Sequence, residues 1–160
     1  MDKKINIIAS ACVVDNNKVL LVQENKEEIK GLWDLPGGKV KSDEDIKQAV
    51  IREILEETGY KIDVNNILLI QNYVTDTGVL LIIFFNAKLL DNKQLKYREN
   101  EIKSVKWFTL EELKNIPKDK IRGGDGFDKI LDNIENNKNY PLDILDIHNY
   151  IKWKEKKLWI

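Results

Sequence analysis

Residues Gly37–Tyr60 read G-G-K-V-K-S-D-E-D-I-K-Q-A-V-I-R-E-I-L-E-E-T-G-Y, and they predict a loop, one helix and a stop. The helix is expected at about 43–58. Ser42 is a good N-cap, and Asp45 three residues later completes a capping-box pattern. Gly59 is expected to end the helix, because the residue after a helix often needs a left-handed backbone that glycine adopts without strain. The rest of the chain is expected to pack around this helix.

The predicted helix has an apolar face and an acidic face. Its apolar residues share one broad side at about 100° per residue and are expected to pack on a sheet: Val50, Ile51, Ile54, Leu55 and Thr58. Glu53, Glu56 and Glu57 share the neighbouring side at the i, i+3 and i+4 spacing. Such an acidic face is either solvated or holds a hard divalent cation, because Mg²⁺ and Mn²⁺ prefer carboxylate oxygens.

The spacing in this stretch resembles the signature of the Nudix hydrolase family, G-x5-E-x7-R-E-U-x-E-E-x-G-U, in which U is aliphatic. The match includes Gly38, Glu44 and the run Arg52–Tyr60. Every fixed position agrees, and only Tyr60 departs, in the last aliphatic place. Flanking features consistent with the family extend the resemblance to roughly residues 5–135. The resemblance implies an α/β fold, an α/β/α sandwich with a mixed β-sheet between helices.

The resemblance also implies that Mg²⁺, or Mn²⁺ in its place, binds the acidic face of the helix. The implied metal ligands are Glu53, Glu56, Glu57 and the loop residue Gly38. Glu44 is expected to support the site or a second metal, and Arg52 to hold a helix glutamate through its bidentate guanidinium. Glu53 is the first candidate for the base that activates water. Glu101 is the second candidate. The resemblance also implies that a loop carboxylate joins the metals; Glu101 matches best, with Glu99 as the fallback.

The loop before the helix carries the expected substrate contacts. Its sequence W-D-L-P-G-G, residues 33–38, is typical of the family. Backbone N–H groups in such a glycine turn can contact phosphate oxygens. Trp33 alone would be a core aromatic, and in the family context its backbone is expected beside the substrate pocket. The candidate substrate-binding residues are Trp33, Gly37, Gly38 and Lys39.

The implied reaction is hydrolysis of a phosphoanhydride bond in a nucleoside diphosphate derivative by attack of metal-activated water. A MutT-like nucleoside triphosphate substrate remains by elimination, because the residues that mark the ADP-ribose, dinucleoside-polyphosphate and coenzyme A subfamilies are missing. No proline, for example, lies between Pro36 and Pro117. Two alternatives stay open: a non-catalytic nucleotide-binding sensor, and an enzyme that removes pyrophosphate from RNA 5′ ends.

Composition bounds the class of protein. The chain has 160 residues, a size typical of one domain, and a formal net charge of −1. This balance gives no general basic field, so a small nucleotide is the expected partner and nucleic acid is not. The lone cysteine, Cys12, fits a reducing compartment. No apolar run reaches the roughly 18 residues of a membrane span. We therefore expect a cytoplasmic protein that does not enter a membrane, and a homodimer stays open.

Apolar runs predict the remaining elements. Residues 5–14 and 18–23 are expected to form a long antiparallel strand pair around a turn at 15–17. The most apolar run, 79–90, is expected to be a central strand covered on both faces. Further strands are expected at 33–35, 62–64, 67–74 and 102–108, and helices at 109–113 and 127–134.

The C-terminal residues, about 141–158, are expected to add a helical extension to a single Nudix domain that covers residues 1–160 and has its core at about 5–135. Trp153 lies among lysines on the helix face opposite to the apolar one. This extension is expected to pack on the domain, to form a dimer contact or to supply a basic edge of the substrate site. His148, the only histidine, is not expected to be catalytic. The apolar face would consist of Ile144, Ile147, Ile151 and Leu158.

Overall fold

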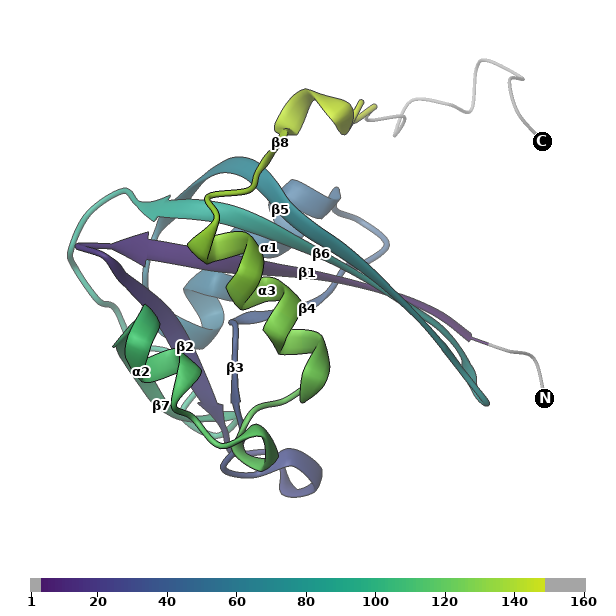
Figure 1. The fold of residues 1–160 in the computed structure, drawn as a ribbon. Coiled ribbons are helices and arrows are strands. Elements are labelled where there is room, and N and C mark those ends of the chain that lie inside the picture. Colours follow the sequence, from purple (N-terminus) through teal and green to yellow (C-terminus); the bar gives the residue numbers. More distant parts are fainter. Residues whose placement is uncertain (1–3, 149–160) are drawn as a thin grey trace, which may run out of the picture.

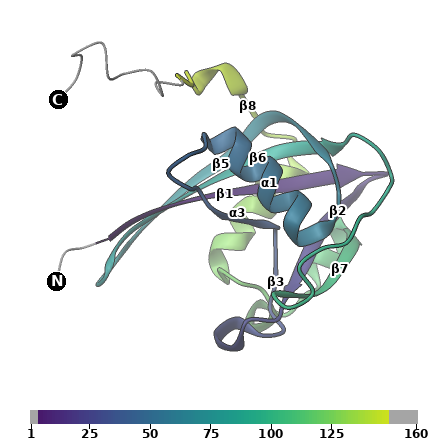
Figure 2. The same ribbon diagram turned by 180° about the vertical axis from the view of Figure 1, so that it is seen from behind.

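A mixed β-sheet between helices forms the body of the protein in the computed structural model, which describes residues 4–148. Helix α3 (Asp125–Glu135) covers one face of the sheet in Figure 1, and helix α1 (Ile46–Thr58) lies behind the other. From behind, in Figure 2, α1 is in front and α3 is at the back. The predicted α/β/α sandwich is confirmed.

The long strands lie at the centre of this fold and the short ones at its edges. A third helix, α2 (Leu110–Lys114), follows the last long strand, and 3-10 turns occur at Glu27–Ile29, Lys118–Lys120 and Leu142–Ile144. The strands are β1 (Lys4–Asp15), β2 (Lys18–Glu24), β3 (Trp33–Asp34), β4 (Gly37–Lys39), β5 (Ile62–Thr75), β6 (Gly78–Leu89), β7 (Ile102–Thr109) and β8 (Tyr140–Pro141).

Strand β6 is the centre of the sheet, as its apolar sequence predicts. It runs parallel to β1 and antiparallel to β5. The strand order is β3-β2-β1-β6-β5-β8, with β4 paired to β1 and β7 paired to β2. The side chains of β6 alternate between two hydrophobic cores, because successive residues of a strand point to opposite faces. Ile83 and Phe85 join the core cluster that contains Val50 and Ile54 of α1, and Phe84 joins the cluster that contains Phe127 of α3.

The first two strands do not form the long antiparallel pair that their sequence predicts. Only Val14 with Val19 and Asp15 with Lys18 are paired. The turn itself is as expected, with left-handed φ values of 46° at Asn16 and 58° at Asn17. Beyond it the strands diverge, because β1 is already flanked by β4 and β6 while β2 pairs with β3 and β7. The end of β2 therefore lies beside residues 33–38, which contain Gly37 and Gly38 and are called the glycine loop below.

Strand β5 is another correction. The predicted pair of short strands is one continuous strand, interrupted by register shifts between Val64 and Asn66 and between Ile67 and Leu69. The shifts are β-bulges, which bend a strand without ending it.

Helix α1 begins later than predicted and ends as predicted. Asp45, not Ser42, is the N-cap: its side chain accepts from the Gln48 backbone N–H, and the Gln48 side chain accepts from the Asp45 N–H. The preceding residue, Glu44, is occupied elsewhere, because it accepts from the Lys41 N–H at 2.9 Å and from Arg52. Gly59 closes the helix with a left-handed φ of 75°.

The described part of the C-terminal extension is not the predicted helix. Tyr140 and Pro141 pair with the edge of β5, and only a 3-10 turn follows. Ile144 is 70% exposed and Ile147 is 40% exposed, so neither belongs to a packed apolar face here. The rest of the predicted helix, with Ile151, Trp153 and Leu158, lies outside the described residues. Across residues 4–148, no helix combines the length and the apolar character needed to cross a membrane.

Candidate active site

The glycine loop is held against β1, and glycine is required there by space. Gly37 and Gly38 pair with Ser10 and Ala9. A Cβ at Gly37 would lie 2.5 Å from the Ala9 carbonyl oxygen and from the Ser10 Cα. Ser10 Oγ secures the loop by donating to the Pro36 carbonyl at 2.9 Å. The loop backbone therefore has one fixed path past the C-terminal half of α1.

Gly38 lies directly over the carboxylate of Glu53. A Cβ added at Gly38 would come within 2.7 Å of both Glu53 carboxylate oxygens. Glu53 is itself buried, with 7% of its surface exposed. The signature glycine thus leaves room for a glutamate that the helix presents to the loop.

Arg52 organises three carboxylates. Its Nε donates to Glu44 Oε2 at 2.8 Å, and its Nη1 donates to Glu56 Oε2 at 2.9 Å and to Glu53 Oε1. Its Nη2 donates to the Lys39 carbonyl at 3.2 Å. The hydrogen bonds from Arg52 lower the pKa of Glu44 to about 2, so Glu44 is charged at neutral pH. The structure therefore brings Glu44 and Arg52 together with the helix glutamates, as the sequence predicts.

Replacing Arg52 by lysine should weaken divalent metal binding. Lysine keeps the charge but cannot hold Glu44, Glu53 and Glu56 at the same time. We expect Mn²⁺ affinity to fall by about 10- to 100-fold, the range typical of lost support for metal ligands. Isothermal titration with Mn²⁺ would measure the change. Because the charge is retained, a loss would report geometry, and an unchanged affinity would show that Arg52 does not position these carboxylates.

A second arginine, Arg98, enters the site from the loop between β6 and β7, and the sequence pattern did not point to it. Its guanidinium pairs with Glu56 and lies 3.8 Å from Glu53 Oε2 and 3.7 Å from Glu101 Oε1. Its backbone N–H donates to the Glu56 carbonyl at 2.8 Å. A distance of 42 residues along the chain separates Arg98 from Glu56, so only the folded sheet brings them together.

The carboxylate of Glu101 lies in the site. Within residues 4–148, the carboxylate of Glu99 forms no ion pair with the arginines of the site. Glu101 accepts from Lys26 Nζ at 2.9 Å and lies beside Arg98. The Lys26 hydrogen bond holds the pKa of Glu101 below its usual value. Glu99 is exposed, and its backbone carbonyl, rather than its carboxylate, contacts Asn25. Of Glu101 and Glu99, the structure places Glu101 beside Lys26 and Arg98.

Glu57 is the most deeply buried glutamate of the acidic face. It is 3% exposed, and no ion pair among residues 4–148 includes it. Its Oε2 accepts from the Gly37 N–H at 2.9 Å, so that N–H is engaged by the helix. Burial, opposed by this hydrogen bond and by Lys26 and aided by the charges of Glu24 and Glu53, raises the pKa of Glu57 to about 8.

The metal-free protein should therefore lose stability as the pH rises from about 5 to about 8. The ordinary pKa of a glutamate is 4.5, so over this interval the unfolded chain has released a proton that folded Glu57, with a pKa of about 8, still holds. Since the folded state binds more protons, stability falls with pH, by at most roughly 5 kcal/mol. Urea unfolding in EDTA at several pH values would measure the slope. Glu57→Gln should reduce it, and a wild-type stability that rises over this interval would contradict the assignment.

The residues of the acidic face suit a hard divalent cation. Among residues 4–148, no three acidic, histidine or cysteine side chains are placed to hold a metal ion together. In this arrangement Arg52 and Arg98 pair with Glu53 and Glu56. The donor set nevertheless consists of carboxylate oxygens, which Mg²⁺ and Mn²⁺ prefer. Glu57 is buried and forms no ion pair in the described part of the chain, and Gly38 has no side chain between the loop and the Glu53 carboxylate. These features fit a cation better than a solvated acidic face.

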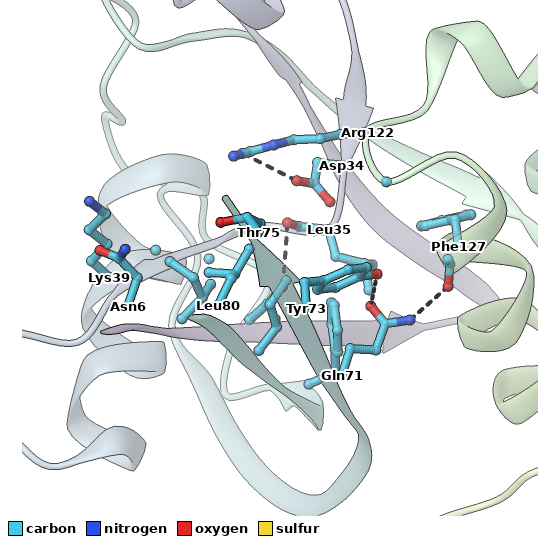
Figure 3. Close-up of a pocket in the computed structure, with 18 of the residues that line it drawn as sticks. Asn6, Asp34, Leu35, Lys39, Gln71, Tyr73, Thr75, Leu80, Arg122 and Phe127 are labelled. Atoms are coloured by element: carbon cyan, nitrogen blue, oxygen red, sulfur yellow. Dashed lines mark hydrogen bonds and ion pairs between the residues drawn. The ribbon is translucent and has the colours of Figure 1, made fainter. Parts of the chain in front are cut away.

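A cavity of about 680 Å³ lies beside the glycine loop (Figure 3). Its walls come from β1, the β5–β6 hairpin, the glycine loop and the start of α3. Of the predicted substrate-binding residues, Gly37, Gly38 and Lys39 line it. The Trp33 ring packs in the core at 4.9 Å from the Phe108 ring. The prediction concerned its backbone, whose carbonyl accepts from the N–H of the cavity residue Arg122 at 2.9 Å. The neighbours of Trp33 line the cavity: Asp34 and Leu35.

Several polar residues of the cavity were not predicted. Tyr73 Oη donates to Gln71 Oε1 at 2.8 Å, and Gln71 Nε2 donates to the Gly126 carbonyl at 2.8 Å. Arg122 lies 3.5 Å from Asp34 (Figure 3). Burial raises the pKa of Asp34 to about 7 despite the charge of Arg122. A carboxyl group with such a pKa can both donate and accept hydrogen bonds near neutral pH.

The fold is that of known Nudix proteins. A NUDIX hydrolase from Nitrosomonas europaea superimposes with a TM-score of 0.80 at 25% identity, over 91% of this chain and 98% of that one. A MutT protein from Methanosarcina mazei superimposes with a TM-score of 0.69 at 25% identity, over 87% of this chain and 99% of that one.

The chain belongs to the NUDIX family, because the NUDIX domain model matches residues 5–127. Nudix hydrolase 6 of Arabidopsis thaliana is 35% identical over 104 residues, which is 62% of this chain and 37% of that protein. A Methanocaldococcus jannaschii protein named ADP-ribose pyrophosphatase is 40% identical over 53 residues, which is 33% of this chain and 31% of that protein. The chain thus spans about a third of the length of these curated relatives.

Proposed function

We propose that this chain is a Mg²⁺-dependent pyrophosphohydrolase that cleaves a phosphoanhydride bond of a nucleoside diphosphate derivative. The observation that carries the proposal is the meeting of Gly38 with buried Glu53 and of Gly37 with buried Glu57, beside a cavity large enough for a nucleoside. Family membership supports the same reaction class. A bound divalent cation supplies charge neutralisation for the phosphates and lowers the pKa of water.

Each residue of the site has a separate part in this proposal. Glu53, Glu56 and Glu57 would hold the cation, and Gly38 allows the loop to pass close to it. Arg52 and Glu44 position the helix glutamates, as their hydrogen bonds indicate.

The proton of the attacking water needs an acceptor, and Glu53 remains the first candidate. Both candidates pair with a cation, Glu53 with Arg52 and Glu101 with Lys26. Glu53 is preferred because it lies directly under the glycine loop. The exposed Lys39 lines the same cavity and suits contact with phosphate oxygens.

A nucleoside triphosphate is the proposed substrate class. Apolar side chains suited to stacking or covering a base line the cavity, among them Leu80, Ile82 and Phe84, together with the polar group of Gln71 and Tyr73. A second candidate is ADP-ribose, since one relative carries the name ADP-ribose pyrophosphatase over the 53 residues that match. We further propose one domain over residues 1–160 and a cytoplasmic location.

A hydrolysis screen tests the function. Wild-type protein with Mg²⁺ would be given deoxynucleoside triphosphates, oxidised deoxynucleoside triphosphates, nucleotide sugars, ADP-ribose, dinucleoside polyphosphates and 5′-triphosphate RNA, with products identified by mass. The proposal expects turnover of a nucleoside triphosphate that stops when the metal is chelated. Nucleotide binding without any product would favour the sensor alternative, and preferred cleavage of RNA would favour 5′-end pyrophosphate removal.

A further inference from the structure

Glu24, the last residue of β2, is a buried carboxylate that the proposed function does not yet use. It is 3% exposed and lines the cavity together with Lys26 and Asp34. Its Oε1 lies 3.3 Å from Arg122 Nη1. Its Oε2 is buried without a hydrogen-bond partner in the described part of the chain. Because an unsatisfied buried carboxylate oxygen is costly, this atom calls for a ligand.

A second buried carboxylate lies within electrostatic range of Glu24. Glu57 interacts electrostatically with Glu24, and its Oε2 accepts from the N–H of Gly37, which lines the same cavity as Glu24. Both Glu24 and Glu57 are 3% exposed. When both groups are ionised, they repel each other and also any phosphate that enters the cavity. A divalent cation between them would remove both repulsions at once.

Other occupants satisfy fewer of these conditions. A water molecule or a substrate N–H could donate to Glu24 Oε2, but neither would balance the charges of both carboxylates when they are ionised. Arg122 offsets them only in part, because its side chain is 50% exposed and is shared with Asp34 at 3.5 Å. Glu24 faces the cavity from a strand, and Glu57 lies on a helix next to the cavity residue Gly37. Carboxylate oxygens from two such elements are suitable ligands for Mg²⁺ or Mn²⁺.

The position of Glu24 is fixed by its backbone. Its N–H donates to the Leu32 carbonyl at 2.9 Å, and its carbonyl accepts from the Gly31 N–H at 2.8 Å. These bonds tie the end of β2 to the segment that leads into the glycine loop. The side chain is therefore presented by a strand, outside the stretch that resembles the family signature.

We propose that Glu24 is a metal ligand that, with Glu57, holds a divalent cation at the cavity end of the acidic helix face. This inference rests on the proposed function, because it assumes that the glutamates of α1 bind metal. It adds a ligand from strand β2 to a ligand set that the sequence places on the helix, its loop and the loop before β7.

Mn²⁺ titration of the metal-free full chain tests the proposal, read by calorimetry and by the electron paramagnetic resonance signal of free Mn²⁺. Glu24→Gln should bind Mn²⁺ at least ~10-fold more weakly than wild type. Its melting temperature without metal should be no lower than that of wild type, since a buried charge is removed. Glu28→Gln changes an exposed glutamate of the following turn and should bind Mn²⁺ like wild type.

Two further variants keep the test decisive. Arg122→Gln removes the partner of Glu24 Oε1 and should leave Mn²⁺ binding as tight as in wild type or tighter. If Glu24 served only Arg122, both variants would change the melting temperature without changing Mn²⁺ affinity. Should Glu24→Gln fail to fold, Glu24→Asp, which shortens the side chain by one methylene, decides by the same titration.

The outcomes separate the inference from the function beneath it. Wild-type protein that binds no Mn²⁺ would overturn the proposed function and the inference together. If Glu24→Gln bound Mn²⁺ as tightly as wild type does, the inference alone would be overturned, and a buried water would be left as the partner of Glu24 Oε2. A loss of affinity confined to the Glu24 variants would support it.

Discussion

Glu57→Gln should lower kcat at least ~100-fold while the protein stays folded. The substitution removes a charged ligand from the most buried position of the acidic face, where Glu57 is 3% exposed. It preserves shape, and the amide oxygen can still accept from the Gly37 N–H. Without metal, glutamine also resembles the protonated carboxyl that a pKa of about 8 favours at neutral pH. The loss should therefore appear in turnover and metal affinity, and not in stability.

Steady-state kinetics at saturating Mg²⁺, with circular dichroism to verify folding, would measure this effect. Glu99→Gln is a matched control, because Glu99 is an exposed carboxylate on the neighbouring loop, and it should turn over like wild type. Equal kcat values for Glu57→Gln and wild type would remove Glu57 from the site. A variant that fails to fold would show a structural role instead.

Gly38→Ala should be almost as damaging to activity. The added Cβ would stand within 2.7 Å of both Glu53 carboxylate oxygens, so either the carboxylate or the loop must move. A displacement of about 1 Å in a catalytic group can cost roughly 100-fold in rate. We expect a loss of that order in kcat/KM. The cost in stability should be only about 1–3 kcal/mol, typical of overpacking, because a side chain can yield.

Gly37→Ala is the informative comparison. Its Cβ would meet the backbone of β1, 2.5 Å from the Ala9 carbonyl and the Ser10 Cα, and backbone cannot yield as a side chain can. We expect Gly37→Ala to lower the melting temperature more than Gly38→Ala does. Wild-type activity in Gly38→Ala would mean that the loop and Glu53 need not approach each other.

The sequence predicted the part of the site that is local. Glu53, Glu56 and Glu57 lie on one helix, so the 3.6-residue period places them together without knowledge of the fold. Gly38 and Glu44 follow from the spacing of the signature. The helix start was wrong by three residues, because Asp45 and Ser42 both suit an N-cap and the hydrogen bonds of Glu44 to Arg52 are not visible in the sequence.

The residues that were missed come from distant strands and loops. Arg98 contacts Glu56 across 42 residues, and Arg122 contacts Glu24 across 98. Such contacts depend on how the sheet closes, which strand periodicity does not specify. For the same reason β1 and β2 were expected to pair along their whole length, although only their ends next to the turn do. The ring of Trp33 packs on Phe108, and its neighbours Asp34 and Leu35 line the cavity.

The most direct measurement is hydrolysis of a nucleoside triphosphate in ¹⁸O-labelled water, by wild type and Glu57→Gln, with Mg²⁺ and with EDTA. We expect nucleoside monophosphate and pyrophosphate as products, one oxygen label in one of them, and formation only by wild type with Mg²⁺. Release that is unaffected by EDTA or by Glu57→Gln would contradict a metal-dependent reaction at the acidic face of α1. Tight nucleotide binding with no labelled product from any nucleoside diphosphate derivative would contradict hydrolysis itself.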